Sequence, residues 1–143
     1  MTQAEFTLDG NFDELTRLTA EVGQFCQTNQ LSSEVDFDLN LALEELFVNS
    51  VKHGGCAGMA EAASIRLQFD GKDVLVMFCD RGAPFNPLDL PPLDPLATLE
   101  QRKRGGLGVH LVRQIMEDLA YQRVDGWNRM TMRRVIPAAV FKS

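Results

Sequence analysis

The chain has 143 residues, of which 45% are hydrophobic and 24% charged, with a net charge of −6, and these values indicate a single folded, acidic domain over residues 1–143. A chain of this length can bury a core without a disulfide or a structural metal. No apolar run reaches the roughly 18 residues of a membrane span and the first residues lack a signal-peptide pattern, so we expect a cytoplasmic protein that is not bound to a membrane.

Hydrophobic spacing predicts two helices after a first strand at 4–8. Apolar residues recur every three or four positions between Asn11 and Asn29, as in an amphipathic helix. Ser32 and Ser33 offer N-caps for a second helix, which the glycine pair at 54–55 ends. The apolar residues assigned to these helices are Phe12, Leu15, Leu18, Val22, Phe25, Phe37, Leu39, Leu43, Leu46 and Phe47.

The middle of the chain predicts a β-hairpin followed by a long loop. Residues 65–69 alternate between apolar and polar, and 74–79 form a nearly continuous apolar run, which is typical of a central strand. Five of the six prolines lie between Ala83 and Arg104, so this stretch is neither a continuous helix nor a central strand. We interpret it as a lid and expect the segment 86–103 to be mobile.

The last third predicts a helix over 107–119 and a closing hairpin of 121–124 and 127–136, turned at Asp125-Gly126. Together these elements predict an α+β two-layer sandwich, in which a mixed, mainly antiparallel sheet carries its helices on one face.

Charge and cysteine content narrow the class of site. Residues 1–100 hold 17 acidic and 5 basic side chains, whereas residues 101–143 hold 3 acidic and 9 basic ones. The basic excess is either a solvated face or an anion site with a surface for an acidic partner. Three cysteines without a C-x-x-C pair disfavour a disulfide framework and zinc, and the overall acidity disfavours nucleic acid.

The first motif that suggests chemistry lies on the second predicted helix. Glu45 and Asn49 are four residues apart and therefore share one face, with His53 a further turn along. A carboxylate and an amide oxygen so placed can hold a proton acceptor beside a magnesium ligand. Taken alone, the spacing is more often an exposed polar stripe.

The second motif, Asp80-Arg81-Gly82-Ala83-Pro84-Phe85, directly follows the central strand. Asp80 could accept a hydrogen bond from an exocyclic amine, and Gly82 would let the backbone approach a flat ring. Taken alone, it is an ordinary turn at the end of a strand.

The third motif is the glycine-rich stretch 104–108, which runs into a helix and has basic residues beside it. Such a helix start suits phosphates, although glycines there also serve as hinges. It is neither a Walker A loop nor a dinucleotide fingerprint.

In this order, the three motifs resemble the GHKL (Bergerat-type) ATPase fold of gyrase, Hsp90, MutL and histidine kinases. More narrowly, the chain resembles the stand-alone anti-sigma-factor serine/threonine kinases. The segment 45–54 matches the N box of that family, Asp80 to Phe85 its first glycine box, and 105–108 its second.

The resemblance implies roles for individual residues. Glu45 would be the general base, Asn49 would bind Mg²⁺, and Asp80 would read the adenine of ATP. The wider set implied to bind the nucleotide is Asn49, His53, Asp80, Gly82, Pro84, Phe85, Arg104, Gly105, Gly106, Leu107, Gly108 and Thr131. Pro84 occupies the position at which the wider superfamily has a second glycine. This difference restricts the resemblance to the stand-alone kinases, in which proline is familiar at this position.

The resemblance also implies a STAS-domain anti-anti-sigma substrate, a sequestered sigma factor and a homodimer. Two alternatives stay open at this point. One is a non-catalytic binding module gated by ATP, and the other is a switch kinase that acts on a scaffold and activates a phosphatase or cyclase.

Overall fold

The computed structural model describes residues 2–89 and 106–137. Five strands and three helices position the site, together with the short 3-10 turns η1 (Phe12–Glu14) and η2 (Pro87–Asp89). In chain order they are β1 (Thr2–Leu8), α1 (Leu15–Thr28), α2 (Ser33–Lys52), β2 (Ala63–Phe69), β3 (Asp73–Asp80), α4 (Gly106–Ile115), β4 (Glu117–Val124) and β5 (Trp127–Val135).

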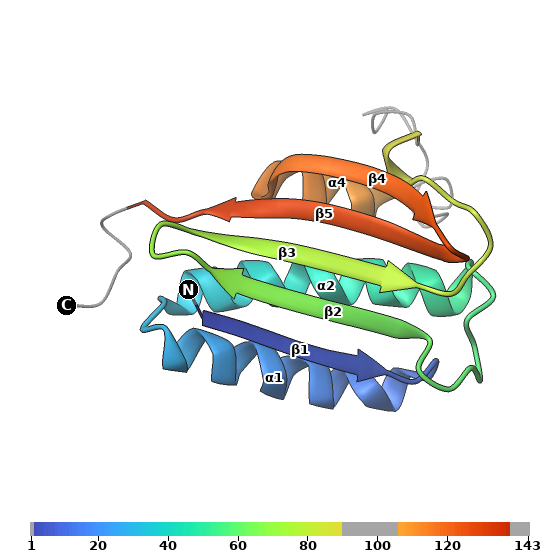
Figure 1. The fold of residues 1–143 in the computed structure, drawn as a ribbon, viewed down its shortest axis with the longest axis horizontal. Coiled ribbons are helices and arrows are strands. Elements are labelled where there is room, and N and C mark those ends of the chain that lie inside the picture. Colours follow the sequence, from blue (N-terminus) through green and yellow to red (C-terminus); the bar gives the residue numbers. More distant parts are fainter. Residues whose placement is uncertain (1, 90–105, 138–143) are drawn as a thin grey trace.

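The strands form one sheet in the order β1-β2-β3-β5-β4, and every neighbouring pair in it is antiparallel. The three helices lie behind this sheet on one face, with α2 across its middle (Figure 1). The predicted α+β two-layer sandwich is therefore confirmed, with β3 as the central strand.

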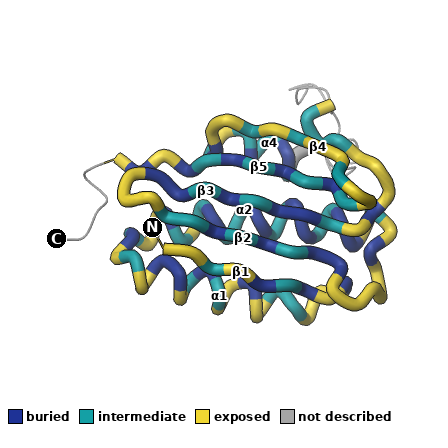
Figure 2. Tube along the Cα trace, in the orientation of Figure 1, coloured by how far each residue is buried: buried dark blue, intermediate teal, exposed yellow. Residues whose placement is uncertain are grey.

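The core lies between the sheet and the helices. Along β3, Val74, Val76 and Phe78 are buried toward the helices. Leu75 and Met77 alternate onto the opposite face, called the helix-free face because no described helix covers it, and are half-buried (Figure 2). The apolar run that predicted a central strand thus places apolar side chains on both faces of the sheet. No described helix is long and apolar enough to cross a bilayer.

The helix cap at Ser32 and the tight turn at Asp125-Gly126 that the sequence predicted are both present. The Ser32 side chain accepts a hydrogen bond from the Val35 amide at 3.3 Å and so caps α2. Asp125 and Gly126 adopt φ values of 50° and 85°, as the tight hairpin between β4 and β5 requires.

Three expectations about the helices were wrong. Phe12 is 45% exposed and lies in η1, before α1 begins at Leu15. Phe37 is 66% exposed, because it lies two positions, or about 200°, away from the buried Leu39 around the helix. The predicted helix 107–119 ends at Ile115, and Leu119 belongs to β4, whose pairing with β5 shifts register between Glu117 and Ala120. Leu119 still packs against the core, which is why it fitted the helical spacing.

The predicted lid is described only as far as Asp89, and its remainder lies outside the described residues. Within the part that is described, the Arg113 guanidinium of α4 donates a hydrogen bond to the Leu88 carbonyl of η2. This bond ties the beginning of the proline-rich stretch to the helix that follows it.

Candidate functional site

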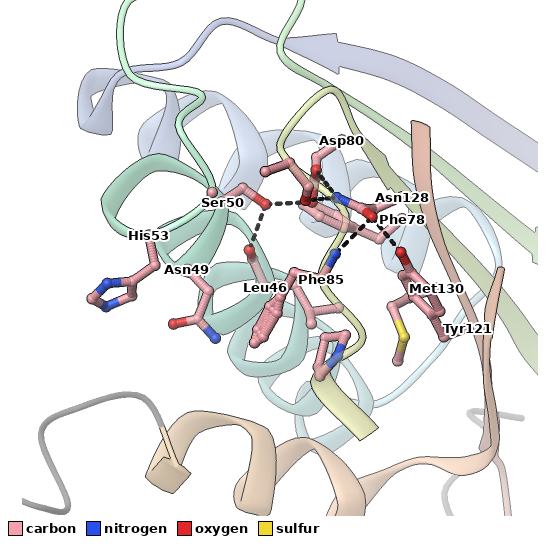
Figure 3. Close-up of a pocket in the computed structure, with 13 residues that line it drawn as sticks. Leu46, Asn49, Ser50, His53, Phe78, Asp80, Phe85, Tyr121, Asn128 and Met130 are labelled. Carbon is pink, nitrogen blue, oxygen red and sulfur yellow. Dashed lines mark hydrogen bonds between the residues drawn. The ribbon is translucent and has the colours of Figure 1, made fainter. Parts of the chain in front are cut away.

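A cavity of about 260 Å³ opens where the C-terminal ends of β3 and α2 lie side by side (Figures 1 and 3). Apolar and aromatic side chains form most of its wall, and a few polar groups point into it. The lining residues are Leu46, Asn49, Ser50, His53, Gly54, Phe78, Asp80, Ala83, Phe85, Pro87, Tyr121, Asn128 and Met130. An apolar cleft with a few convergent polar groups is the usual form of a small-molecule site.

Asp80, the last residue of β3, is held by three protein donors. Its Oδ1 accepts from the Gly82 amide at 2.8 Å and from Asn128 Nδ2 at 2.9 Å, and its Oδ2 accepts from Ser50 Oγ at 2.7 Å (Figure 3). The carboxylate is therefore fixed in orientation at the wall of the cavity. The sequence singled out Asp80 but neither Ser50 nor Asn128 as its partners.

Gly82 is required by a close backbone approach. A Cβ at this position would lie 2.6 Å from the Gly54 carbonyl oxygen and 3.0 Å from Asp80 Oδ1. The same Gly54 carbonyl accepts from the Ala83 amide at 3.1 Å. The structure thus gives this glycine a role in joining the loop to the end of α2, in addition to the room for a ring that the sequence suggested.

Two polar residues of the N-box helix reach the cavity. Asn49 and His53 both line it, one turn apart on α2 (Figure 3). Within the described part of the chain, the Asn49 carboxamide makes no hydrogen bond, so its oxygen is available to a ligand. One such oxygen suits magnesium, which is usually held by few protein oxygens together with substrate phosphates and water.

Glu45 lies one turn before Asn49 and does not line the cavity wall. Its carboxylate instead faces the first turn of α4, because a Cβ built on Gly108 would lie only 2.1 Å from Glu45 Oε2. Among the described residues it has no ion pair. The structure therefore brings the first and third motifs into contact, with a free carboxylate at the start of a helix.

The remaining residues of the second glycine box are described only in part. Gly106 is the first residue of α4, and Leu107 follows it in the helix. Arg104 and Gly105 lie outside the described residues. The helix N-terminus at Gly106 provides backbone amides of the kind that bind phosphate.

Two further residues of the predicted site, Pro84 and Thr131, do not line the cavity, as is also true of Glu45 and Gly82. Pro84 is exposed and does not line it, although Phe85, which is 38% exposed, does. Thr131 alternates with the buried Met130 and Met132 on β5 and so points to the helix-free face, where it borders a different hollow. The structure therefore places Thr131 away from the cavity, and Asn128, three positions earlier on β5, lines it instead.

Cys56 follows α2 and lies near Asp80. Burial, together with the negative charge of Asp80, raises the pKa of its thiol, although the Arg81 backbone amide acts in the opposite direction. The thiol is therefore neutral near pH 7, which suits a packing role beneath the site better than a nucleophile.

The arrangement defines a class of protein. A fixed carboxylate sits in an apolar slot at one end, and an amide oxygen, a free carboxylate and a helix N-terminus lie at the other. A flat base with an amine and a charged phosphate chain matches these two ends. This is the layout of a nucleotide-binding α/β sandwich.

Comparison with known proteins agrees with that class. The profile of the histidine kinase-like ATPase domain matches residues 10–134, and the chain belongs to that family. It is 34% identical over 103 residues to the serine/threonine-protein kinase BtrW of Bordetella bronchiseptica, covering 71% of each chain. The GHKL-type family predicted from the three motifs is thereby confirmed.

Two further proteins are similar over different shares of their length. The serine-protein kinase RsbW of Bacillus subtilis is 30% identical over 93 residues, which span 62% of this chain and 58% of that protein, less than two thirds of it. The crystal structure of the RsbU and RsbW domains of a Mycobacterium tuberculosis protein superposes with a TM-score of 0.70 at 15% identity. It covers all of this chain and 35% of that one, and it supports the fold alone.

Proposed function

We propose that this protein is an ATP-dependent serine/threonine protein kinase of the anti-sigma type, which phosphorylates a STAS-domain anti-anti-sigma partner. The observation that carries the proposal is the placement of Glu45 and Asn49 on one face of α2, both without described partners, between the Asp80 cavity and the start of α4. A site built only to sense ATP needs the cavity and a metal ligand. It has no use for a free carboxylate held at the phosphate end.

The chain's own residues would divide the work. Asp80 would accept a hydrogen bond from the adenine amine, while Phe85 and Phe78 would provide apolar surface for the ring. The start of α4 would receive the phosphates, and the Asn49 oxygen would hold Mg²⁺, which would neutralise phosphate charge. Glu45 accepts the proton of the incoming serine hydroxyl, a contribution of about 10² to 10⁴ in rate.

Partners and location complete the proposal. The protein sequesters a sigma factor when its STAS partner is phosphorylated, acts in the cytoplasm, and forms one domain over residues 1–143. It works as a homodimer, and the helix-free face with Leu75 and Met77 is the surface available to a second copy. The alternative of a switch kinase stays open. It differs in that the protein would activate a phosphatase or cyclase instead of sequestering a sigma factor.

The test is phosphoryl transfer to a defined partner. The purified protein is mixed with Mg-ATP and each STAS-domain protein encoded near its gene, and intact-mass spectrometry looks for one added phosphoryl group on a serine. Asn49→Ala is the negative control. If a STAS protein forms an ATP-dependent complex but never gains phosphate, the non-catalytic module takes the place of the kinase.

A further inference from the structure

Asn128 is a buried polar residue at the cavity whose contacts the catalytic roles above do not use. It is 5% exposed and stands directly opposite Asp80 in the register of β3 and β5. Because the two strands are antiparallel, this pairing joins the end of β3 to the start of β5, next to the loop that carries Ala83 and Phe85.

The carboxamide of Asn128 is saturated on both sides. Its Nδ2 donates to Asp80 Oδ1 at 2.9 Å and to the Ala83 carbonyl at 2.8 Å, with the Gly82 carbonyl at 3.4 Å. Its Oδ1 accepts from the Phe85 amide at 3.2 Å and also from Tyr121 and Arg123. The nitrogen faces only acceptors and the oxygen accepts only from donors, so the amide orientation is determined and no capacity remains for a ligand.

This saturation decides what Asp80 can offer. An ionised carboxylate has about four acceptor positions, two on each oxygen. On Oδ1 both are occupied, by Gly82 and Asn128, and on Oδ2 one is occupied by Ser50. A single acceptor position is left, on Oδ2, at the wall of the cavity.

We propose that Asn128 is the positioning residue that makes the site selective for adenine. By holding Asp80 Oδ1 and the loop from Gly82 to Phe85, it leaves one fixed acceptor that pairs with one exocyclic amine. This inference rests on the proposed function, because it assumes that a purine occupies the cavity. A base with a carbonyl at the same position would place two acceptors against each other.

Asn128 also fixes the loop that borders the base. Ala83 and Phe85 both line the cavity, and each is bonded through its backbone to the same carboxamide. The Arg123 guanidinium reinforces this by donating to the Gly82 carbonyl at 2.8 Å. Loss of the carboxamide therefore removes one of the three hydrogen bonds to Asp80 and the carboxamide's bonds to Ala83 and Phe85 together, although every nucleotide-contacting side chain remains.

The experiment measures base preference, which is the ratio of the dissociation constants of purine riboside triphosphate, which lacks the 6-amino group, and ATP, both with Mg²⁺. A hydrogen bond to a charged acceptor predicts a preference of about tenfold or more for ATP in the wild type. Asn128→Leu removes the carboxamide, and Asn128→Asp keeps its shape but turns an oxygen toward Asp80. Both should lower the preference to within about threefold of unity.

Val22→Ala is the matched control for lost stability, since Val22 is fully buried on α1 and does not line the cavity. It should lower the melting temperature and leave the base preference unchanged. If both Asn128 variants fail to fold, Asn128→Thr replaces them. Threonine suits a central strand, but its hydroxyl has one proton and cannot donate to Asp80 and Ala83 at once, so the preference should fall here too.

The possible outcomes distinguish a failure of the inference about Asn128 from a failure of the proposed function. A wild-type preference that the folded Asn128 variants lose and Val22→Ala keeps supports the inference. A preference that the Asn128 variants retain overturns it and leaves the proposed function standing. A wild type that binds ATP without any preference overturns the inference through Asp80 itself, and a wild type that binds neither nucleotide overturns the proposed function.

Discussion

Gly108 gives a way to move the proposed general base without altering it. A Cβ at this position would lie 2.1 Å from Glu45 Oε2, 3.0 Å from Cδ and 3.4 Å from Cγ. These atoms are the end of a flexible side chain, so in Gly108→Ala the carboxylate rotates away while the backbones of α2 and α4 stay in place. Alanine also favours a helix over glycine by about 0.5–1 kcal/mol, so we expect an unfolding free energy within about 1 kcal/mol of the wild type.

The displaced carboxylate should lower phosphoryl transfer. If Glu45 accepts the serine proton, misplacing it removes much of a contribution of about 10² or more in rate. Because the Gly108 amide is retained, we expect the affinity for Mg-ATP to change only a few-fold. The assay is single-turnover transfer to the STAS partner at saturating ATP, with calorimetry for nucleotide binding and chemical denaturation for stability.

A double-mutant cycle identifies the cause. Glu45→Ala should lower transfer by about a hundredfold and keep ATP affinity within a few-fold. Adding Gly108→Ala to that variant should then change little, because the carboxylate that it displaces is gone. The reasoning is refuted if Gly108→Ala transfers at the wild-type rate, or if it costs the same factor with and without Glu45.

Three further predictions concern single contacts. Asn49→Ala should lose both Mg-ATP affinity and transfer, because it removes the only described amide oxygen proposed as a metal ligand; an Asn49→Ala variant that binds Mg-ATP as tightly as the wild type in calorimetry would contradict this. Thr131→Val should leave ATP affinity unchanged, since Thr131 lies on the helix-free face, and a several-fold weakening would return it to the site. Asp38→Asn should cost about 1–3 kcal/mol in denaturation, because Asp38 pairs with Arg134 at 2.8 Å and both are nearly buried. The control Glu5→Gln breaks an exposed pair and should cost under about 0.5 kcal/mol.

The fold was predictable where the apolar residues of a segment follow a single hydrophobic period. The alternation along β2 has the period of a strand, the short apolar run of β3 is typical of a central strand, and Ser32 supplies a cap that acts within three residues. The errors arose where two spacings overlapped. Leu119 continues the helical spacing of α4 and also packs inward from β4, and no local signal distinguishes these environments. Phe37 shows that an apolar residue near a helix start does not have to face the core.

The site was predictable as far as its contacts are local in sequence. Glu45, Asn49 and His53 share a face because of helix geometry alone, and Asp80 ends a recognisable strand. The partners of Asp80 depend on the register between β3 and β5, which hydrophobic pattern fixes only in parity. That parity already places Thr131 on the face opposite to the buried Met130 and Met132, but it could not select Asn128, which pairs with Asp80, from the other residues of its own face.

Helix α2 connects the two ends of the site, and sequence spacing likewise did not predict which residues its side chains contact. Asn49 and Ser50 are consecutive, so their side chains diverge by about 100° around the helix. Ser50 donates to Asp80 at the base end, whereas Asn49 is free to meet the phosphates. Glu45, one turn earlier, touches α4 at Gly108. One rigid segment thus links the carboxylate proposed to read the base, through Ser50, to the carboxylate proposed to accept the proton, so a shift of α4 would act on Glu45 while leaving Asp80 in place.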